Sequence, residues 1–258
     1  MAILTLTCPA CQKLFSFTTH PAFDTGEDAS IAEKVRTGEA FVGACPHCGH
    51  AEHYSYSFLY KERESHALLY YADNEEDFQK ACAIMTGRDP SVPWAGIADW
   101  SRRVVANRQV LLEKLLLLDL HLDDRVIEIM KVLAHSFLQK QKPGLSVDAI
   151  WFERGADGRT GYCLYQDGKI VCAYAFDAAM YEQVKQQLSP AFAETEREDI
   201  LIDASWAAEL LKRPAWEYSC LEMRREREKR ERRWHARFHT ASPAIAPSQA
   251  AAQKADVK

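Results

Sequence analysis

Four cysteines in two short motifs are the residues of this sequence with the clearest chemistry. The motifs are Cys8-Pro9-Ala10-Cys11 and Cys45-Pro46-His47-Cys48. A tight turn with this spacing lets both thiols face one ion, and two such turns supply the four ligands of a closed tetrahedral zinc site. The sequence therefore predicts one structural Zn²⁺ ion held by Cys8, Cys11, Cys45 and Cys48.

The residues around each cysteine pair favour the turn that a metal site needs. Pro9 and Pro46 restrict φ inside the two motifs, and Gly49 permits the backbone twist that follows the second one. Gln12 occupies the corresponding position after the first motif, so we expect the first turn to be the less ideal half.

The second motif, Cys45-Pro46-His47-Cys48, also occurs as the redox motif of periplasmic thiol oxidases, where the first thiolate lies at a helix N-terminus. Here Gly49 and an alternating strand pattern follow it, and a second cysteine pair is present, so the sequence favours metal binding over redox chemistry. His47, His50 and His53 are interpreted as surface residues or neighbours of the ligands, with His50 the best placed to lie near the metal. With four thiolates available, no open coordination position for hydrolysis is expected.

The sequence predicts a ribbon-type β module over residues 1–72, because strand patterns flank both cysteine motifs. We expect strands at residues 3–7, 14–19, 54–60 and 67–72. Between the motifs, Ser30 and Glu33 have capping-box spacing and Gly38 is a plausible stop, which predicts a small helix.

Longer helices are expected next. A helix is predicted over residues 75–85, and apolar residues from Ile97 to Leu122 are spaced as one face of a second. A third helix begins after Asp123 and ends before Pro143. We interpret the last two as an antiparallel hairpin that buries apolar surface.

The segment after residue 143 predicts a second α+β unit. Strands are expected at 147–154, 160–166 and 169–176, with Asp167-Gly168 as a two-residue turn. Counting back from this turn places Cys163 opposite Cys172, where a disulfide is sterically conceivable, although a reducing compartment favours free thiols. Asp177 is expected to cap a helix that ends near Ser189-Pro190, and residues 197–211 predict another helix.

The predicted fold class is therefore α+β, with three parts. These are a zinc-ribbon-like β module with a helical hairpin (1–142), an α+β domain formed by a three-strand meander and helices (144–215), and a charged helix with a disordered tail (216–258).

Charge is distributed unevenly along the chain. Residues 224–239 hold eight bases and three acids, a net charge of +5, whereas the whole chain carries −5. Bases with Trp234 and Phe238 could bind nucleic acid through phosphate contacts and stacking. The interleaved glutamates also suit a solvated helix with internal ion pairs, and the acidic remainder would repel a polyanion.

The sequence predicts a cytoplasmic protein that does not cross a membrane. No apolar run, Leu115–Leu118 included, approaches the length of a membrane span, and the first residues lack the features of a secretory signal.

Over roughly residues 4–135 the chain resembles the CpXC family of bacterial and archaeal proteins, named for paired Cys-Pro-x-Cys motifs. Both motifs carry the resemblance, together with Glu113-Lys114 and Leu122-Asp123-Asp124-Arg125-Val126-Ile127-Glu128, which resemble the family's helical segment. The resemblance implies a zinc-ribbon-like module of undetermined function, with the four cysteines as ligands and no catalytic residue. Residues 144–258 lie outside it.

The sequence favours a non-catalytic, structural-zinc protein that acts as an interaction or adaptor protein for a protein partner. It contains no glycine-rich phosphate loop, nucleophile elbow or metalloprotease helix. The first alternative is a nucleic-acid-binding regulator that uses residues 224–239. The second is a cytoplasmic thiol redox or metal-delivery protein.

Overall fold

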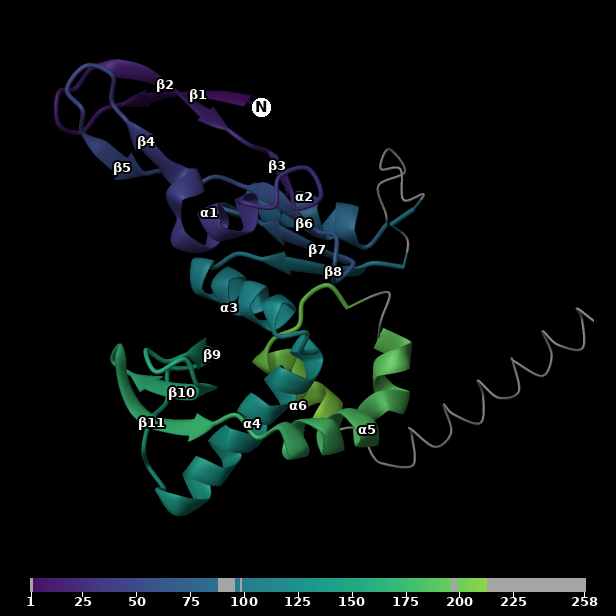
Figure 1. Cartoon of the computed structure of the whole chain (residues 1–258). Coiled ribbons are helices and arrows are strands. Elements are labelled where there is room, and N and C mark those ends of the chain that lie inside the picture. The colour runs from purple at the N-terminus through teal and green to yellow at the C-terminus, as the bar shows by residue number, and fades with distance from the viewer. Residues whose placement is uncertain (1, 88–95, 98, 196–198, 213–258) are drawn as a thin grey trace, which may run out of the picture. The chain divides into compact units, whose positions relative to one another are not determined.

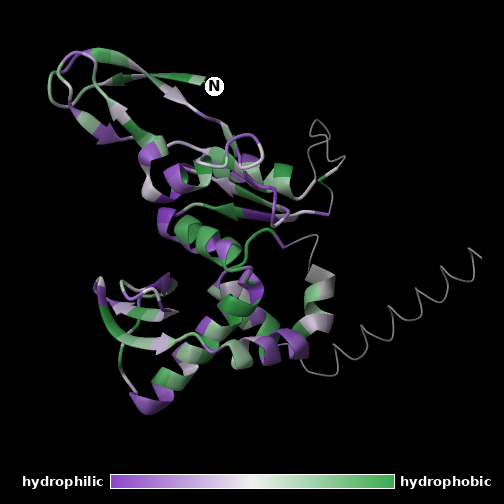
Figure 2. Cartoon of the chain, in the orientation of Figure 1, coloured by the Kyte–Doolittle hydropathy of each residue, from purple (hydrophilic) through white to green (hydrophobic). Residues whose placement is uncertain are grey.

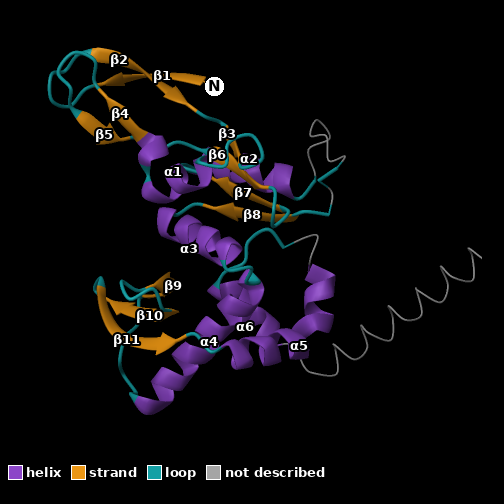
Figure 3. Ribbon diagram, viewed as in Figure 1, coloured by secondary structure: helices purple, strands orange, loops and turns teal. Residues whose placement is uncertain are grey.

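The computed structural model describes residues 2–87, 96–97, 99–195 and 199–212 (Figure 1). The expected α+β class is confirmed, with helices and several small sheets in the described residues (Figure 3). The predicted basic helix at 224–239, Cys220 and the tail lie outside the described residues. No helix in the described ranges has the length and apolar character needed to cross a membrane.

Two β-hairpins form the start of the chain. Strands β1 (Ala2–Thr7) and β2 (Leu14–Thr19) pair antiparallel, as do β4 (Val42–Ala44) and β5 (Ala51–His53). Alternate residues of β2 are buried, whereas β1 is exposed along nearly its whole length. The first two predicted strands are thereby confirmed, and each hairpin turn contains one cysteine motif.

The segment between the hairpins contains β3 (Ala22–Asp24), α1 (Ile31–Thr37) and the 3₁₀ turn η1 (Glu39–Phe41). The helix is confirmed, and Gly38 ends it in the left-handed region at φ 85°. The predicted capping box is wrong. Ser30 has helical dihedrals and its hydroxyl donates to Asp28 Oδ1 at 2.7 Å, so it does not cap the helix.

A four-stranded sheet follows, in the order β3-β6-β7-β8, with β6 (Phe58–Glu62), β7 (Ala67–Tyr71) and β8 (Ser101–Val105). The predicted strand 54–60 is only partly correct, because residues 54–57 form a connection. Ser57 in this connection donates to Asp77 Oδ2 at 2.6 Å, and the Tyr54 ring lies 5.2 Å from that of Phe17. These tertiary contacts outweigh the alternating pattern.

Helix α2 (Glu75–Met85) is confirmed, but the single helix expected from Ile97 to Leu122 is wrong. Residues 101–105 instead form β8, which pairs parallel with β7, and α3 (Arg108–Asp119) begins only after Asn107. The Asn107 side chain accepts a hydrogen bond from the Gln109 N–H at 2.7 Å, which fixes that helix start. Apolar spacing alone did not separate a short strand from a helix.

Helix α4 (Asp124–Gln141) begins after Asp123, whose carboxylate accepts from the Arg125 N–H as predicted. The packing of α3 and α4 differs from a simple hairpin. Helix α3 lies against β7, β8 and the later strand β9 (Ala149–Arg154), whereas α4 packs on α5 (Ala178–Thr195) and α6 (Ala204–Lys212).

The predicted meander is confirmed as β9, β10 (Thr160–Gln166) and β11 (Lys169–Ala175), in the order β11-β10-β9. Asp167 and Gly168 form its two-residue turn with φ of 49° and 70°. The predicted pairing of Cys163 with Cys172 is wrong, because a register shift leaves Val171 without a partner. Cys163 lies opposite Ala173 and Cys172 opposite Leu164, so the two free thiols point to opposite faces.

The Asp177 cap of α5 is confirmed, since its Oδ1 accepts from the Ala179 and Met180 N–H groups. The helix continues through Pro190 instead of ending there, and Phe192 beyond the proline is buried. Of the helix expected at 197–211, residues 199–203 precede α6 and lie along β8 and α3.

The division of the chain near residue 143 stays a prediction, but side chains from both sides of it interact. Glu113 on α3 accepts a hydrogen bond from the Phe152 N–H at 2.7 Å, and Lys114 donates to the Ile202 carbonyl at 3.0 Å. The described residues up to 212 belong to one compact unit.

Candidate metal centre

The four cysteines of the two hairpin turns lie together, although 33 residues separate the motifs. Their Sγ atoms all lie within 4.8 Å of one another. Cys8 Sγ is 3.6 Å from Cys48 Sγ, and Cys11 Sγ is 3.7 Å from Cys45 Sγ. A disulfide would need about 2.05 Å. Four sulfurs each about 2.3 Å from a central Zn²⁺ would lie about 3.8 Å apart, so the observed spacing fits a tetrahedral ion.

The two turns share the same backbone hydrogen bonds. In the first, the Cys8 N–H donates to the Lys13 carbonyl and the Gln12 N–H donates to the Cys8 carbonyl, both at 2.9 Å. In the second, the Cys45 N–H donates to the His50 carbonyl at 2.8 Å, and the Gly49 N–H donates to the Cys45 carbonyl at 2.9 Å. The two halves of the site are therefore equivalent in backbone structure.

The residue after each motif adopts a left-handed conformation. Gly49 has φ 75° and Gln12 has φ 58°, in the region that glycine enters without steric cost. The Gln12 side chain compensates in part, because its Nε2 donates to the Pro9 carbonyl at 3.0 Å. The first turn thus reaches the same geometry as the second with a less suitable residue, as the sequence indicated.

Burial differs among the four thiols. Cys8 and Cys45 are almost fully buried at 0% and 2% exposure, Cys11 is half-buried and Cys48 is exposed. The buried pair belongs to an aromatic core that fixes both hairpins and the sheet beneath them. Its rings include Phe15, Phe17, Phe41, Tyr56 and Phe58.

At these distances the four thiols cannot all lose their protons without repulsion between the thiolates. Desolvation raises the pKa of Cys45, but the His47 and Cys48 N–H groups and neighbouring thiols lower it to about 7. The His50 N–H lowers the pKa of Cys48, but desolvation and the other three thiols raise it to about 12. A cation among the four sulfurs would remove this conflict by stabilising every thiolate. Tetrathiolate sites select zinc or iron–sulfur chemistry.

The three histidines near the second motif lie outside the sulfur cluster. His47 Nε2 is 3.2 Å from the Leu14 carbonyl, so this side chain links the second turn to β2. His50 Nε2 lies 3.7 Å from a Glu52 carboxylate oxygen, and the His53 ring stacks at an angle 5.5 Å from Phe41. In the described residues, the metal-competent group contains the cysteines alone.

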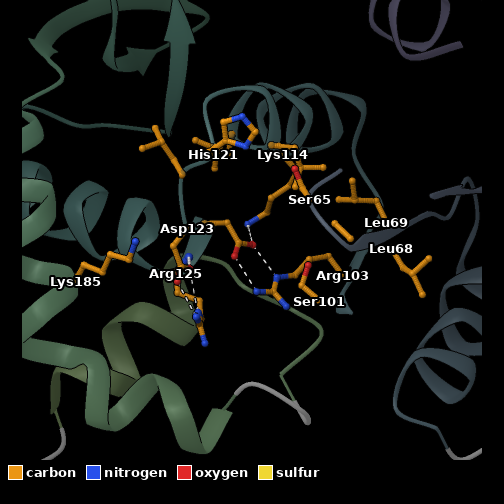
Figure 4. Close-up of a pocket in the computed structure, with 15 residues that line it drawn as sticks. Ser65, Leu68, Leu69, Ser101, Arg103, Lys114, His121, Asp123, Arg125 and Lys185 are labelled. Atoms are coloured by element: carbon orange, nitrogen blue, oxygen red, sulfur yellow. Dashed lines mark hydrogen bonds and ion pairs between the residues drawn. The ribbon is translucent and has the colours of Figure 1, made fainter. Parts of the chain in front are cut away.

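A second cluster of chemically capable residues was missed by sequence reasoning. Buried and partly buried charged side chains on β8, α3 and α4 form a continuous chain of ion pairs. The Arg103 guanidinium binds both oxygens of Asp124 at 2.7 and 2.8 Å, and Lys114 Nζ contacts Asp124 Oδ2 at 2.7 Å (Figure 4). We call the cluster of Arg103, Glu113, Lys114, Asp124, Glu128 and Lys131 the buried charge cluster.

Its second half joins the two helices. Lys131 Nζ lies 2.6 Å from Glu113 Oε1 and 2.9 Å from Glu128 Oε1. Three positive and three negative groups are paired, so the cluster is neutral. Desolvation raises the pKa of Asp124, but Arg103 and Lys114 hold it well below its usual range. The sequence places charged residues within the apolar faces of the helices, but their spacing alone does not show which of them form ion pairs.

A cavity of about 340 Å³ borders this cluster (Figure 4). It lies between β7 and the turn joining α3 to α4, and its lining includes Leu68, Arg103, Lys114, His121 and Asp124. Arg103 and Lys114 face the carboxylate with which they are already paired. Their arrangement therefore supports packing of the two helices against the sheet more than catalysis.

No curated protein and no solved structure matches the chain. Residues 6–131, which include both cysteine motifs, the end of β1, the elements from β2 to α3 and the first turns of α4, match the model of the family described as CpXC protein. Over this region the chain belongs to the CpXC family.

Proposed function

We propose that the chain is a non-catalytic zinc protein in which one structural Zn²⁺ ion joins two β-hairpins into a ribbon, and that this ribbon serves contacts with another macromolecule. The observation that carries the proposal is the spacing of the four Sγ atoms, 3.6 and 3.7 Å across the two turns. Four protein thiolates would complete a tetrahedron and leave no position for a substrate.

The shortness of the hairpins supports a structural role for the ion. The hairpins are short, with strands of three residues in β4 and β5, and an isolated pair of short strands is marginally stable in water. An ion that joins them supplies folding free energy directly. The four thiols must stay reduced, which fits the cytoplasm as part of the same proposal.

The test is elemental analysis of freshly purified full-length protein. We expect one zinc per chain, held against dialysis and released by a strong chelator together with four newly reactive thiols. Iron in place of zinc would reassign the ion, and a folded amino-terminal half with no bound metal would overturn the proposal.

Two variants sharpen this test. Cys11→Ser removes one ligand and should abolish stoichiometric zinc binding. Cys82→Ser is the matched control, because Cys82 lies on α2 outside the sulfur cluster and should leave one zinc per chain. Rapid alkylation of Cys45 in the zinc-loaded protein would instead favour the thiol redox alternative.

A further inference from the structure

The outer strand of the first hairpin, β1, has an unpaired edge with no protection. All of its residues, Ala2 to Thr7, are exposed or half-buried, and none is charged. Ile3 is 70% exposed and Leu4 40% exposed, while Leu14 on the neighbouring strand is 63% exposed. Apolar residues along the start of β1 are visible in Figure 2. Exposed strand edges of this kind are templates for pairing with another strand.

Three other long outer strands in the described residues, β8, β9 and β11, are protected. On β8, the Val104 N–H donates to the Ile200 carbonyl, so a later segment covers that edge. On β9, the Glu113 carboxylate accepts from the Phe152 N–H. Strand β11 begins with Lys169 and contains the bulge at Val171. Charge, bulges and covering segments are the usual protections of strand edges, and β1 has none of them.

The hairpin hydrogen bonds show which backbone groups of β1 point outward. Because the Cys8 N–H donates to the Lys13 carbonyl, alternation along the antiparallel ladder directs the backbone groups of residues 2, 4 and 6 toward β2. The N–H and C=O groups of Ile3, Thr5 and Thr7 therefore point to the free edge. In the described residues, no other strand pairs with them.

We propose that β1 pairs antiparallel with β1 of a second copy of this chain, forming a continuous four-stranded sheet across a twofold axis. An uncharged strand suits itself as partner, since no like charges meet across the axis. A charged partner strand would find no opposite charge on β1. Because the chain as a whole carries −5, an uncharged contact is also where two copies repel least.

The outward groups determine the register of this pairing. A twofold axis perpendicular to the sheet pairs residues that project from the same face, and the largest overlap places Thr5 opposite Thr5 of the second copy. Ile3 then lies opposite Thr7 of the second copy, and Leu4 opposite Leu6 of the second copy. A single-strand contact is smaller than the roughly 1,200–2,000 Å² of stable interfaces, so the dimer is reversible.

The inference rests on the proposed function only in that the ion keeps the hairpin folded. Zinc content is therefore measured on every sample below. Zinc-loaded wild type that stays monomeric up to high micromolar concentration would overturn the inference and leave the metal proposal intact. Protein without metal would count against the metal proposal separately.

The first experiment is sedimentation of wild type and Thr5→Pro over a concentration series. Proline at this position removes an outward N–H and leaves the ladder to β2 complete, as proline is tolerated on a free strand edge. We expect a concentration-dependent dimer for wild type, a monomer for Thr5→Pro, and equal zinc in both. A dimer of unchanged strength in Thr5→Pro would overturn the inference.

The second experiment tests the register with two single-cysteine additions. In the proposed pairing the two Thr5 residues form a hydrogen-bonded pair with Cα atoms about 5.5 Å apart, which suits a disulfide. Ser16 is the matched control, because it is exposed and pairs with Thr5 but lies one strand further inward. Under mild oxidation we expect Thr5→Cys to cross-link at least tenfold faster than Ser16→Cys. Equal rates would show that β1 is not the contact.

Discussion

The chain contains two centres of chemically capable residues that stabilise their surroundings in different ways. The sulfur cluster joins two hairpins with four thiols that repel one another's charge and call for an external cation. The buried charge cluster joins β8, α3 and α4 with three cations and three anions that satisfy one another. The first centre is thus conditional on an ion, whereas the second is complete within the protein.

This difference follows from what each region can bury. The hairpin strands are short and β1 is mostly exposed, so the hairpins contact the aromatic core mainly through alternate residues of β2 and the buried thiols Cys8 and Cys45. Around α3 and α4 the core is extensive, with Leu115, Val126 and Ile127 fully buried. The extensive core around α3 and α4 tolerates the desolvation of the charged cluster, while hairpins that contact the core mainly through one strand gain more from a cross-link.

The largest expected effect comes from removing the proposed ion. For Cys48→Ser, or wild type with excess chelator, we expect hydrogen exchange to become fast in residues 2–53 and to stay slow in residues 108–141. Structural zinc contributes apparent free energies of about 10–16 kcal/mol in small zinc-dependent peptides, so the loss should exceed what the hairpins can compensate. Equal protection from hydrogen exchange in both regions after metal removal would contradict the proposed difference between the two centres.

The second effect tests the buried charge cluster. Asp124→Asn leaves Arg103 and Lys114 without their shared carboxylate, and we expect a loss of about 3–5 kcal/mol in the free energy of unfolding. Zinc content should not change. The matched control is Asp157→Asn, because Asp157 pairs with Arg159 at the surface, where solvent screens the pair, so its loss should be far smaller than that of Asp124. Denaturant titration of wild type and the two variants measures both losses. Equal losses would show that the buried charge cluster stabilises the fold no more than a surface ion pair does.

A third prediction concerns an ion pair outside both centres. Hydrogen bonds from Arg63, helped by Lys61, lower the pKa of Asp24 from 3.8 to about 2. The folded state therefore favours the carboxylate, and its contribution to stability is full above pH 4 and lost as the pH falls toward 2. Asp24→Asn should remove this slope from the pH dependence of unfolding. The pair is partly exposed, so its contribution should stay within about 0–1 kcal/mol. If the slope is unchanged in Asp24→Asn, other titrating groups cause the acid sensitivity.

The smallest expected effects on stability come from the residues that follow the two cysteine motifs, one in each half of the sulfur cluster. Gly49→Ala forces a side chain into a φ of 75°, and we expect a loss of about 1–2 kcal/mol although nothing crowds the position. Gln12→Gly relieves the same conformation at the cost of the bond to Pro9, so the two terms should nearly cancel. Thermal unfolding of the zinc-loaded variants measures both. A larger loss for Gln12→Gly than for Gly49→Ala would reverse the ranking of the two turns.

Local sequence chemistry predicted much of the secondary structure. The cysteine spacing, Gly38 after α1, Asp123 before α4, the Asp167-Gly168 turn and Asp177 before α5 were all identified from neighbouring residues. Each depends on contacts within about five positions of the chain. Such contacts are visible in the sequence because the partners are adjacent.

The errors share a cause, which is pairing between distant segments. Residues 101–105 form β8 because β7 offers them a parallel partner, and residues 54–57 leave the strand pattern to contact Phe17 and Asp77. The bulge at Val171 moved Cys163 and Cys172 to opposite faces. In each case a tertiary contact outweighed a local preference of less than about 1 kcal/mol per residue.

The sequence by itself determined which residues could bind an ion and where most turns and helix starts lie, because these depend on near neighbours. Only the tertiary structure decided that four sulfurs from two distant turns meet at 3.6 and 3.7 Å, that six charged side chains in and beside the core pair with one another, and that the outer edge of β1 has no partner strand in the described residues. The reason is that burial and charge compensation are properties of segments brought together by folding, which no single stretch of the chain contains.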